Sequence, residues 1–390
     1  MELRYGIIDE NVLKRSVEDV ILHEGQAAAG RRKDARKAGI DADTDAGRGS
    51  AGPEYPDDMP DKHGTGRTLP SVAAVTLGAG YEGGLAVIRA VNGLAADGIR
   101  AKLFRPVILL PPGTREETLR DLMRQICRTA FSLDLEVAAG QVEVTDAVTR
   151  PLVTGCASGE PFACRKRTSC GRPEKSGPET GRAADLQDKN FLKYKNAVSE
   201  NAGKDQAGPE PEKTDIVAAG WIGLEGTWLL TAGRMEELLH RFPYSLLHRT
   251  EQLREDLCVV RAAGIASEHG ARAMVSPADG GLMAGLWELA KKTGSGLEAD
   301  LQRMPVLQET IEITDHFEIN PYLMKSAGCL LIAAEDGEGL VRRLLEAGIN
   351  AVRIGRLLSD NKKIIYKGEE IRHLDRPQTD SLAAFWKEGL

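Results

Sequence analysis

The sequence is poor in aromatic residues and has no long apolar run. Phe, Trp and Tyr make up 5% of the 390 residues, too few for the stacking platforms that bind single-stranded nucleic acid. The formal net charge of -7 also argues against a nucleic-acid or anionic-membrane partner. No apolar stretch is long enough to span a bilayer, and Met1–Arg15 has no apolar core of signal-peptide length. We therefore expect a cytoplasmic protein with no nucleic-acid and no membrane partner.

Cysteine motifs typical of metal sites are also missing. None of the six cysteines forms a C-x-x-C pair. Cys127, Cys258 and Cys329 fall in apolar segments, which is typical of buried small hydrophobic residues. The other three are loosely spaced around a polar segment and have no histidine nearby, so their spacing favours no zinc site. We assign no metal ligands from the sequence.

Two polar segments differ in composition from the rest of the chain. They cover residues 25–68 and 158–213 and are rich in Gly, Pro, Ser and charge, with few branched apolar residues. Such segments bury too little surface to offset the entropy of ordering, so we expect flexible inserts. The second contains Arg165-Lys166-Arg167, either a solvated charge run or a site for an acidic partner. The inserts are either partner-binding arms or plain linkers.

Helix and strand signals alternate outside these inserts. Apolar periodicity predicts helices over 10–22, 85–97, 235–247, 251–270, 308–317 and 339–347, and strands at 106–110, 135–138, 142–144, 216–219, 329–334 and 351–357. The final strand–helix–strand unit indicates a sheet covered on one face by helices. The sequence therefore predicts two α/β regions.

A tight turn, Asp279-Gly280-Gly281, joins a short apolar strand to an amphipathic helix. Paired glycines at a helix start let a ligand approach the backbone, and the free N–H groups there favour an anion. The alternative is that both glycines only permit close turn geometry. The sequence leaves both interpretations open.

Several segments carry a family resemblance through their order along the chain. They are RYGIIDENVLKRSV, GLAVIRAVNGLAADGI, LLPPGTREETLRDLM, VAAGQVEVTDAVTRPLV, GWIGLEGTWLL, SPADGGLMAGLWELAKKTGSG and EINPYLMKSAGCLLIA. This ordered set resembles the AIR synthase-related (PurM-like) superfamily. That superfamily includes aminoimidazole ribonucleotide synthase, thiamine-monophosphate kinase, selenophosphate synthetase and the hydrogenase expression/formation protein. The chain is most similar to the hydrogenase maturation factor branch.

The resemblance implies an α+β fold of two domains. An N-terminal domain would cover 1–157 and form a dimer interface through its sheet, with GLAVIRAVNGLAADGI as the dimer-interface helix. A C-terminal domain would cover 214–390, its sheet covered by helices, with the 158–213 insert between. The resemblance also implies a homodimer, ATP and Mg²⁺ as cofactors, and a hydrogenase-maturation partner protein. Activity, if present, would be ATP-dependent phosphoryl transfer or dehydratase/ligase-type chemistry.

The acidic motifs of the superfamily are degenerate in this chain. Phosphoryl transfer needs carboxylates to hold the metal. The chain instead has Ala74 where an Asp precedes Thr-Gly, Gly93 after Asn92 where the family has Asn-Asp, and Val275-Ser276-Pro277-Ala278 in place of His-Asp-x-Thr. Glu143 alone remains of a Gly-Gly-x-Thr-Glu turn. The candidate cofactor-binding residues that remain are Asn92, Asp97, Glu143, Glu225, Asp279, Gly280 and Gly281; no catalytic residue is assigned.

Two functions therefore stay open. The first is an ATP-dependent enzyme with a rearranged site. The second is a non-catalytic dimeric binding or scaffold protein that retains only the fold, favoured by the loss of acids at Ala74 and Gly93. Nucleotide binding with and without Mg²⁺ distinguishes them.

Overall fold

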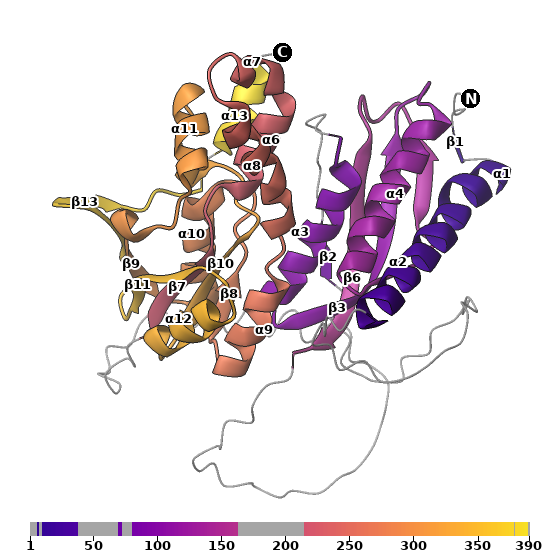
Figure 1. Cartoon of the computed structure of the whole chain (residues 1–390). Helices are drawn as coiled ribbons and strands as arrows, with labels where there is room; N and C mark the ends of the chain where they lie inside the picture. The colour runs from indigo at the N-terminus through magenta and orange to yellow at the C-terminus, as the bar shows by residue number, and fades with distance from the viewer. Residues whose placement is uncertain are drawn as a thin grey trace, which may run out of the picture.

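The computed structural model of the chain describes residues 6–7, 10–37, 69–71, 80–162, 214–377 and 379–388. Within these ranges the chain forms two β-sheets with associated helices, arranged as two halves side by side (Figure 1). The expected α+β architecture is confirmed. Most of the two polar segments, and Ala74, lie outside the described residues.

The N-terminal half is a helix layer on a mixed sheet. Its elements are β1 (Gly6–Ile7), α1 (Glu10–Leu13), the π-helical turn η1 (Lys14–Glu18), α2 (Asp19–Lys37), β2 (Leu69–Ser71), α3 (Glu82–Ala96), β3 (Ile99–Leu110), α4 (Glu116–Ser132), β4 (Glu136–Val137), β5 (Gln141–Val144) and β6 (Leu152–Pro161). The strand order is β1-β5-β3-β6-β2, with β4 also on β3. In Figure 1, α2 and α4 lie in front of this sheet.

The C-terminal half contains a longer sheet. Its strands are β7 (Asp215–Gly220), β8 (Ala273–Val275), β9 (Gly296–Asp300), β10 (Cys329–Ala334), β11 (Ala351–Leu358), β12 (Lys363–Lys367) and β13 (Glu370–His373), in the order β13-β12-β9-β11-β7-β10-β8. Its helical segments are α6 (Leu224–Gly233), α7 (Met235–Leu239), α8 (Tyr244–Gln252), η2 (Leu253–Asp256), α9 (Val260–His269), α10 (Gly281–Thr293), η3 (Leu301–Arg303), α11 (Gln308–His316), η4 (Pro321–Leu323), α12 (Gly337–Glu346) and α13 (Ser381–Glu388).

Helices cover both faces of the C-terminal sheet, not one face as the sequence predicted. Side chains alternate across a strand. In β7, Ile216 and Ala218 join the cluster that contains the α10 leucines, whereas Val217 and Ala219 join the cluster of α9 and α12. All six residues of β10 are buried. A strand that is apolar on both sides needs a cover on both sides, and this explains the correction.

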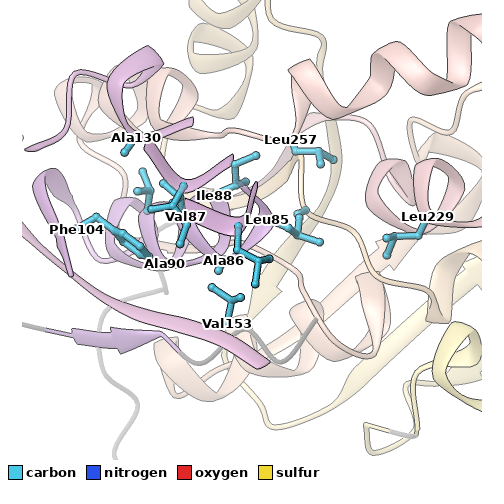
Figure 2. Packing of buried hydrophobic residues seen from close by; sticks show 14 of the residues in the cluster. Leu85, Ala86, Val87, Ile88, Ala90, Phe104, Ala130, Val153, Leu229 and Leu257 are labelled. Atoms are coloured by element: carbon cyan, nitrogen blue, oxygen red, sulfur yellow. The ribbon is translucent and has the colours of Figure 1, made fainter. Parts of the chain in front are cut away.

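Helix α3 lies between the two halves (Figure 1). All of its residues except Glu82 and Gly93 are buried, as expected for a helix that is apolar all round. One hydrophobic cluster joins Leu85 of this helix to Phe104 on one side and to Leu229 and Leu257 on the other (Figure 2). The sequence predicted a dimer-interface helix here; within the chain, Glu82 and Gly93 are the residues of α3 that stay accessible.

The first polar segment begins later than expected. Helix α2 continues through Lys37, so residues 25–37 are helical and not part of a flexible insert. Their composition, GQAAAGRRKDARK, is rich in Ala, Lys and Arg, which are strong helix formers. Likewise β6 extends to Pro161, which pairs with Ile99 of β3, so the second segment cannot begin before residue 162.

The π-helical turn η1, between α1 and α2, is hydrogen-bonded to α4. It presents Arg15 and Ser16 to Glu116, the first residue of α4. Arg15 Nη2 donates to Glu116 Oε2 over 2.7 Å, and Ser16 Oγ donates to Oε1 over 2.9 Å. The Arg15 hydrogen bonds lower the pKa of Glu116 from 4.5 to about 2. This buried carboxylate therefore stays charged and tied to η1.

Two helices predicted over 235–270 are in fact three helices and a 3-10 turn. Helix α7 ends at Leu239, and Pro243 before α8 has an extended backbone with φ -68 and ψ 145, so no continuous helix runs over 235–247. A second interruption separates η2 from α9. There Asn92 Nδ2 donates to Leu257 O over 2.7 Å, and Val259 N donates to Asn92 Oδ1 over 2.9 Å. This tertiary contact is invisible to local sequence patterns.

Two of the apolar-segment cysteines are buried as predicted. Burial raises the pKa of the Cys127 and Cys329 thiols to about 12; Cys258 is half-buried. Thiols in such surroundings stay protonated and behave as small hydrophobic side chains. In the described parts of the chain, none of the helices combines the length and apolarity needed to cross a membrane.

Candidate functional site

Five charged side chains meet where the two halves join. They are Arg89 of α3, Glu225 of α6, Asp279 before α10, Lys325 after η4 and Asp380 before α13. We refer to them as the junction cluster. Each comes from a different element, so the fold and not local sequence brings them together. The cluster contains the predicted Glu225 and Asp279.

Arg89 and Glu225 form the buried centre of the cluster. Arg89 Nε donates to Glu225 Oε1 over 3.0 Å, and Nη2 contacts the same oxygen; the two side chains are 6% and 0% exposed. Glu225 Oε2 also accepts from Ala327 N–H over 3.3 Å. Burial by itself lowers the pKa of Arg89, but the Glu225 and Asp279 carboxylates outweigh that effect and raise it. Arg89 therefore keeps its positive charge in this buried position.

Asp279 lies at the outer edge of the cluster, with its side chain 63% exposed. It pairs with Lys325 Nζ, and its Oδ1 is 3.6 Å from Arg89 Nη2. Partial burial raises the pKa of Asp279, but the Arg89 and Lys325 charges reverse this and hold it below its ordinary value. Two cations of the chain therefore neutralise the exposed carboxylate predicted as a site residue.

The anion position at the start of α10 is filled by the chain itself. Gly280 has φ 77 and caps the helix, and its N–H donates to Asp380 Oδ2 over 2.9 Å. Asp380 Oδ1 in turn accepts from Leu382 N–H over 3.0 Å at the start of α13. Burial raises the pKa of Asp380, while Lys325 and the Gly280 N–H act in the opposite sense. A carboxylate thus occupies the place where the sequence suggested a ligand anion.

Gly281 is required by close packing. Its φ is 64, and a Cβ built there would lie 2.5 Å from Met324 O and 2.8 Å from Tyr322 O. The backbone of 322–324 thus takes the space that a ligand would need. This supports the interpretation that the paired glycines permit close turn geometry.

The other predicted site residues lie elsewhere. Asn92, one turn after Arg89, holds the backbone at Leu257 and Val259. Asp97, at the end of α3, pairs with Lys292 over 2.6 Å. Glu143 is in β5 between the buried Val142 and Val144, so it faces the side of the N-terminal sheet away from the helices.

Sequence reasoning missed Arg89, Lys325 and Asp380. Arg89 had a detectable signal, because it is the only charged residue inside the apolar run of α3, and a buried charge needs a partner. Lys325 and Asp380 had none, because their pairing depends on η4 and on the docking of α13.

The residues of this cluster do not fit a Mg-ATP site. Mg²⁺ is usually bound through one or two carboxylates together with substrate phosphates. Here Glu225 and Asp279 are held by Arg89 and Lys325, and Asp97 is held by Lys292. Among the residues with described positions, His, Cys, Asp and Glu form no group of three or more that could hold a metal ion. We therefore derive no chemical step through a metal or nucleotide at this cluster.

Residues 216–367 match the family model for the AIR synthase related protein, C-terminal domain. No curated protein matches the chain in sequence. Solved structures do match it in fold. The hydrogenase maturation protein HypE of E. coli has a TM-score of 0.57 at 16% identity, covering 81% of this chain and 88% of that chain.

Two further structures of HypE give similar values. HypE in complex with ATP has a TM-score of 0.58 at 16% identity, covering 87% of this chain and 90% of that chain. The HypE-HypF complex has a TM-score of 0.55 at 16% identity, covering 80% and 90%. The resemblance found in the sequence is therefore confirmed: the chain has the fold of the AIR synthase-related superfamily. Its second half carries the AIR synthase related C-terminal domain.

Proposed function

We propose that this protein is a hydrogenase-maturation-factor-like member of the superfamily that works as a non-catalytic binding or scaffold protein. One observation carries the proposal: Arg89 and Lys325 neutralise Glu225 and Asp279. A metal ion at these carboxylates would have to displace two cations that belong to the chain. Displacing Arg89 would leave a buried charge unpaired, which is strongly destabilising.

The surroundings of Gly93 support the same proposal. This residue lies one turn after Arg89 on α3 and is exposed, and outside its own helix the described part of the chain places nothing within 4 Å of a Cβ built on it. The family's aspartate would have room here, so packing does not explain its absence. The loss of this acid fits a junction that no longer holds a metal.

Calorimetry tests the proposal directly. The full chain is titrated with ATP to millimolar concentration, with and without Mg²⁺, and ATP hydrolysis is followed in parallel. We expect no Mg²⁺-dependent heat and no hydrolysis above background. Asp279→Asn is the matched variant, because it removes the exposed carboxylate and keeps its shape. Mg²⁺-dependent binding that this variant abolishes would contradict the proposal.

The second candidate is an ATP-dependent phosphoryl-transfer or dehydratase/ligase-type enzyme with a rearranged site. The likeness to the ATP complex of HypE favours it. Glu143 and Asp97 are the acids outside the junction cluster that such a site would use. Hydrolysis that falls more than tenfold in Glu143→Gln or Asp97→Asn, with folding unchanged, would select this candidate.

We also propose a homodimer formed through the open face of the N-terminal sheet. On that face Leu109 of β3 lies between Glu143 of β5 and Leu152 of β6 in register, and both leucines are only partly buried. A hydrogenase-maturation partner protein is proposed by analogy with the HypE-HypF complex. Mixing the chain with purified HypF and measuring the mass in solution tests this. A cytoplasmic location stays a prediction.

A further inference from the structure

The C-terminal half contains a cavity of about 610 Å³ that shares no residue with the junction cluster. It lies between the first turn of α10, η3, η4, the β12–β13 hairpin and residues 374–377. We call it the hairpin cavity. Its volume falls within the usual range for small-molecule sites, about 300–1,000 Å³.

The inner wall of the hairpin cavity is apolar. Met283, Leu301, Leu323, Ile365 and Leu374 line it. Ile365 and Leu374 are 5% and 7% exposed and belong to the hydrophobic cluster that contains the α10 leucines. They form a fixed floor, because moving them would disturb that hydrophobic cluster. An apolar ligand body would be stabilised here by the removal of its surface from water.

Cations gather on the rim of the same cavity. Lys367, Arg372 and Arg376 line it, and Asp375 is the one carboxylate among the described lining residues. Arg372 pairs with Glu370, whereas within the described ranges neither Lys367 nor Arg376 has an ion pair. This local excess of positive charge stands out in a chain with a net charge of -7. It favours an anionic ligand over a neutral one.

Three polar side chains of the lining add hydrogen-bond donors. Asn320 Oδ1 already accepts from Tyr322 N–H over 3.0 Å, which leaves its amide NH₂ group for a ligand. Burial raises the pKa of Tyr322, so its hydroxyl stays protonated and able to donate. Gln302 adds a second amide. Donors beside cations suit a carboxylate or phosphate group, which is acceptor-rich.

We propose that the hairpin cavity binds a small amphipathic organic anion, with its apolar body on the floor formed by Ile365 and Leu374 and its head group at Lys367 and Arg376. The proposal does not depend on the function proposed above. It assigns a binding role to the β12–β13 hairpin, whose last strand is exposed along its length.

Calorimetry on the full chain tests this with octyl phosphate below its micelle concentration. Octanoate tests the alternative head group, inorganic phosphate lacks the apolar body, and octanol lacks the charge. We expect one of the two amphipathic anions to bind at least about tenfold more tightly than inorganic phosphate and octanol. No binding by either, or equal binding of inorganic phosphate, overturns the proposal.

Variants locate the bound anion. Lys367→Ala with Arg376→Ala should weaken binding about tenfold, since two rim charges are lost. Lys362→Ala with Arg343→Ala removes two cations outside the cavity and should leave binding unchanged. Asp279→Asn should also leave it unchanged, which separates this site from the junction cluster. All these positions are at the surface, and thermal melting confirms folding. Equal affinity of the two double variants overturns the proposal.

Discussion

Arg89 of α3 and Glu225 of α6 form an ion pair that joins the two halves of the molecule out of contact with water. Their side chains are 6% and 0% exposed, and 136 residues separate them in sequence. Two charges in such a place are costly to desolvate, and each is stable only with its partner. The pair therefore fixes which surface of α3 faces the C-terminal half.

Breaking this pair should destabilise the protein strongly. We expect Arg89→Met and Glu225→Gln each to lower the free energy of unfolding by about 3–5 kcal/mol, because each leaves one buried charge alone. The double variant should cost clearly less than the two single changes together. Urea denaturation measures all three. Arg356→Ala, which breaks the exposed Arg356–Glu298 pair, is the control and should cost under about 1 kcal/mol.

Gly281 and Gly294 form a natural matched pair, with φ of 64 and 65. Alanine at Gly294 meets only the left-handed backbone penalty of about 1–2 kcal/mol, because among the described residues nothing lies within 4 Å of its Cβ position. Alanine at Gly281 also meets Met324 O at 2.5 Å. We expect Gly281→Ala to lower the thermal midpoint clearly more than Gly294→Ala. Equal midpoints would show that Met324 moves aside freely.

Glu116 should contribute to acid sensitivity. The pKa of Glu116 is about 2 in the folded chain against 4.5 ordinarily, chiefly through hydrogen bonds from Arg15. The unfolded state therefore binds the proton first, so this stabilisation is complete above about pH 4.5 and is lost towards pH 2. Glu116→Gln should be less stable at pH 7 and should lose less stability between these values. Urea midpoints across pH measure this, with Glu117→Gln as the unaffected control.

The open face of the N-terminal sheet should hold the dimer together. Leu109→Asp places a charge between Glu143 and Leu152 on that face, where a partner sheet would have to bury it. Light scattering coupled to gel filtration should show a monomer for this variant and a dimer for the native chain. Arg115→Asp adds an acid at the start of α4 and should remain dimeric. A native monomer at micromolar concentration would contradict the proposed interface.

Sequence patterns predicted elements whose residues alternate or repeat clearly. The strand at Cys329–Ala334 was predicted with the bounds that the structure shows. The break after Leu257 was not predicted, because it depends on Asn92, which is 165 residues away. The candidate site was predicted in the same uneven way. Glu225 and Asp279 were predicted and do come together. Of their cations, Arg89 had a sequence signal that was missed, and Lys325 became visible only in the fold.

The place of α3 limits how the chain can be divided. Leu85 and Leu94 of this helix share one buried cluster with Leu224 and Trp228 of α6. A fragment that ends before residue 214 would expose to water the apolar side chains of α3 that α6 covers. The complementary fragment would expose the side chains of α6 that α3 covers. The two halves are therefore expected to unfold in one calorimetric transition and to be insoluble when expressed apart.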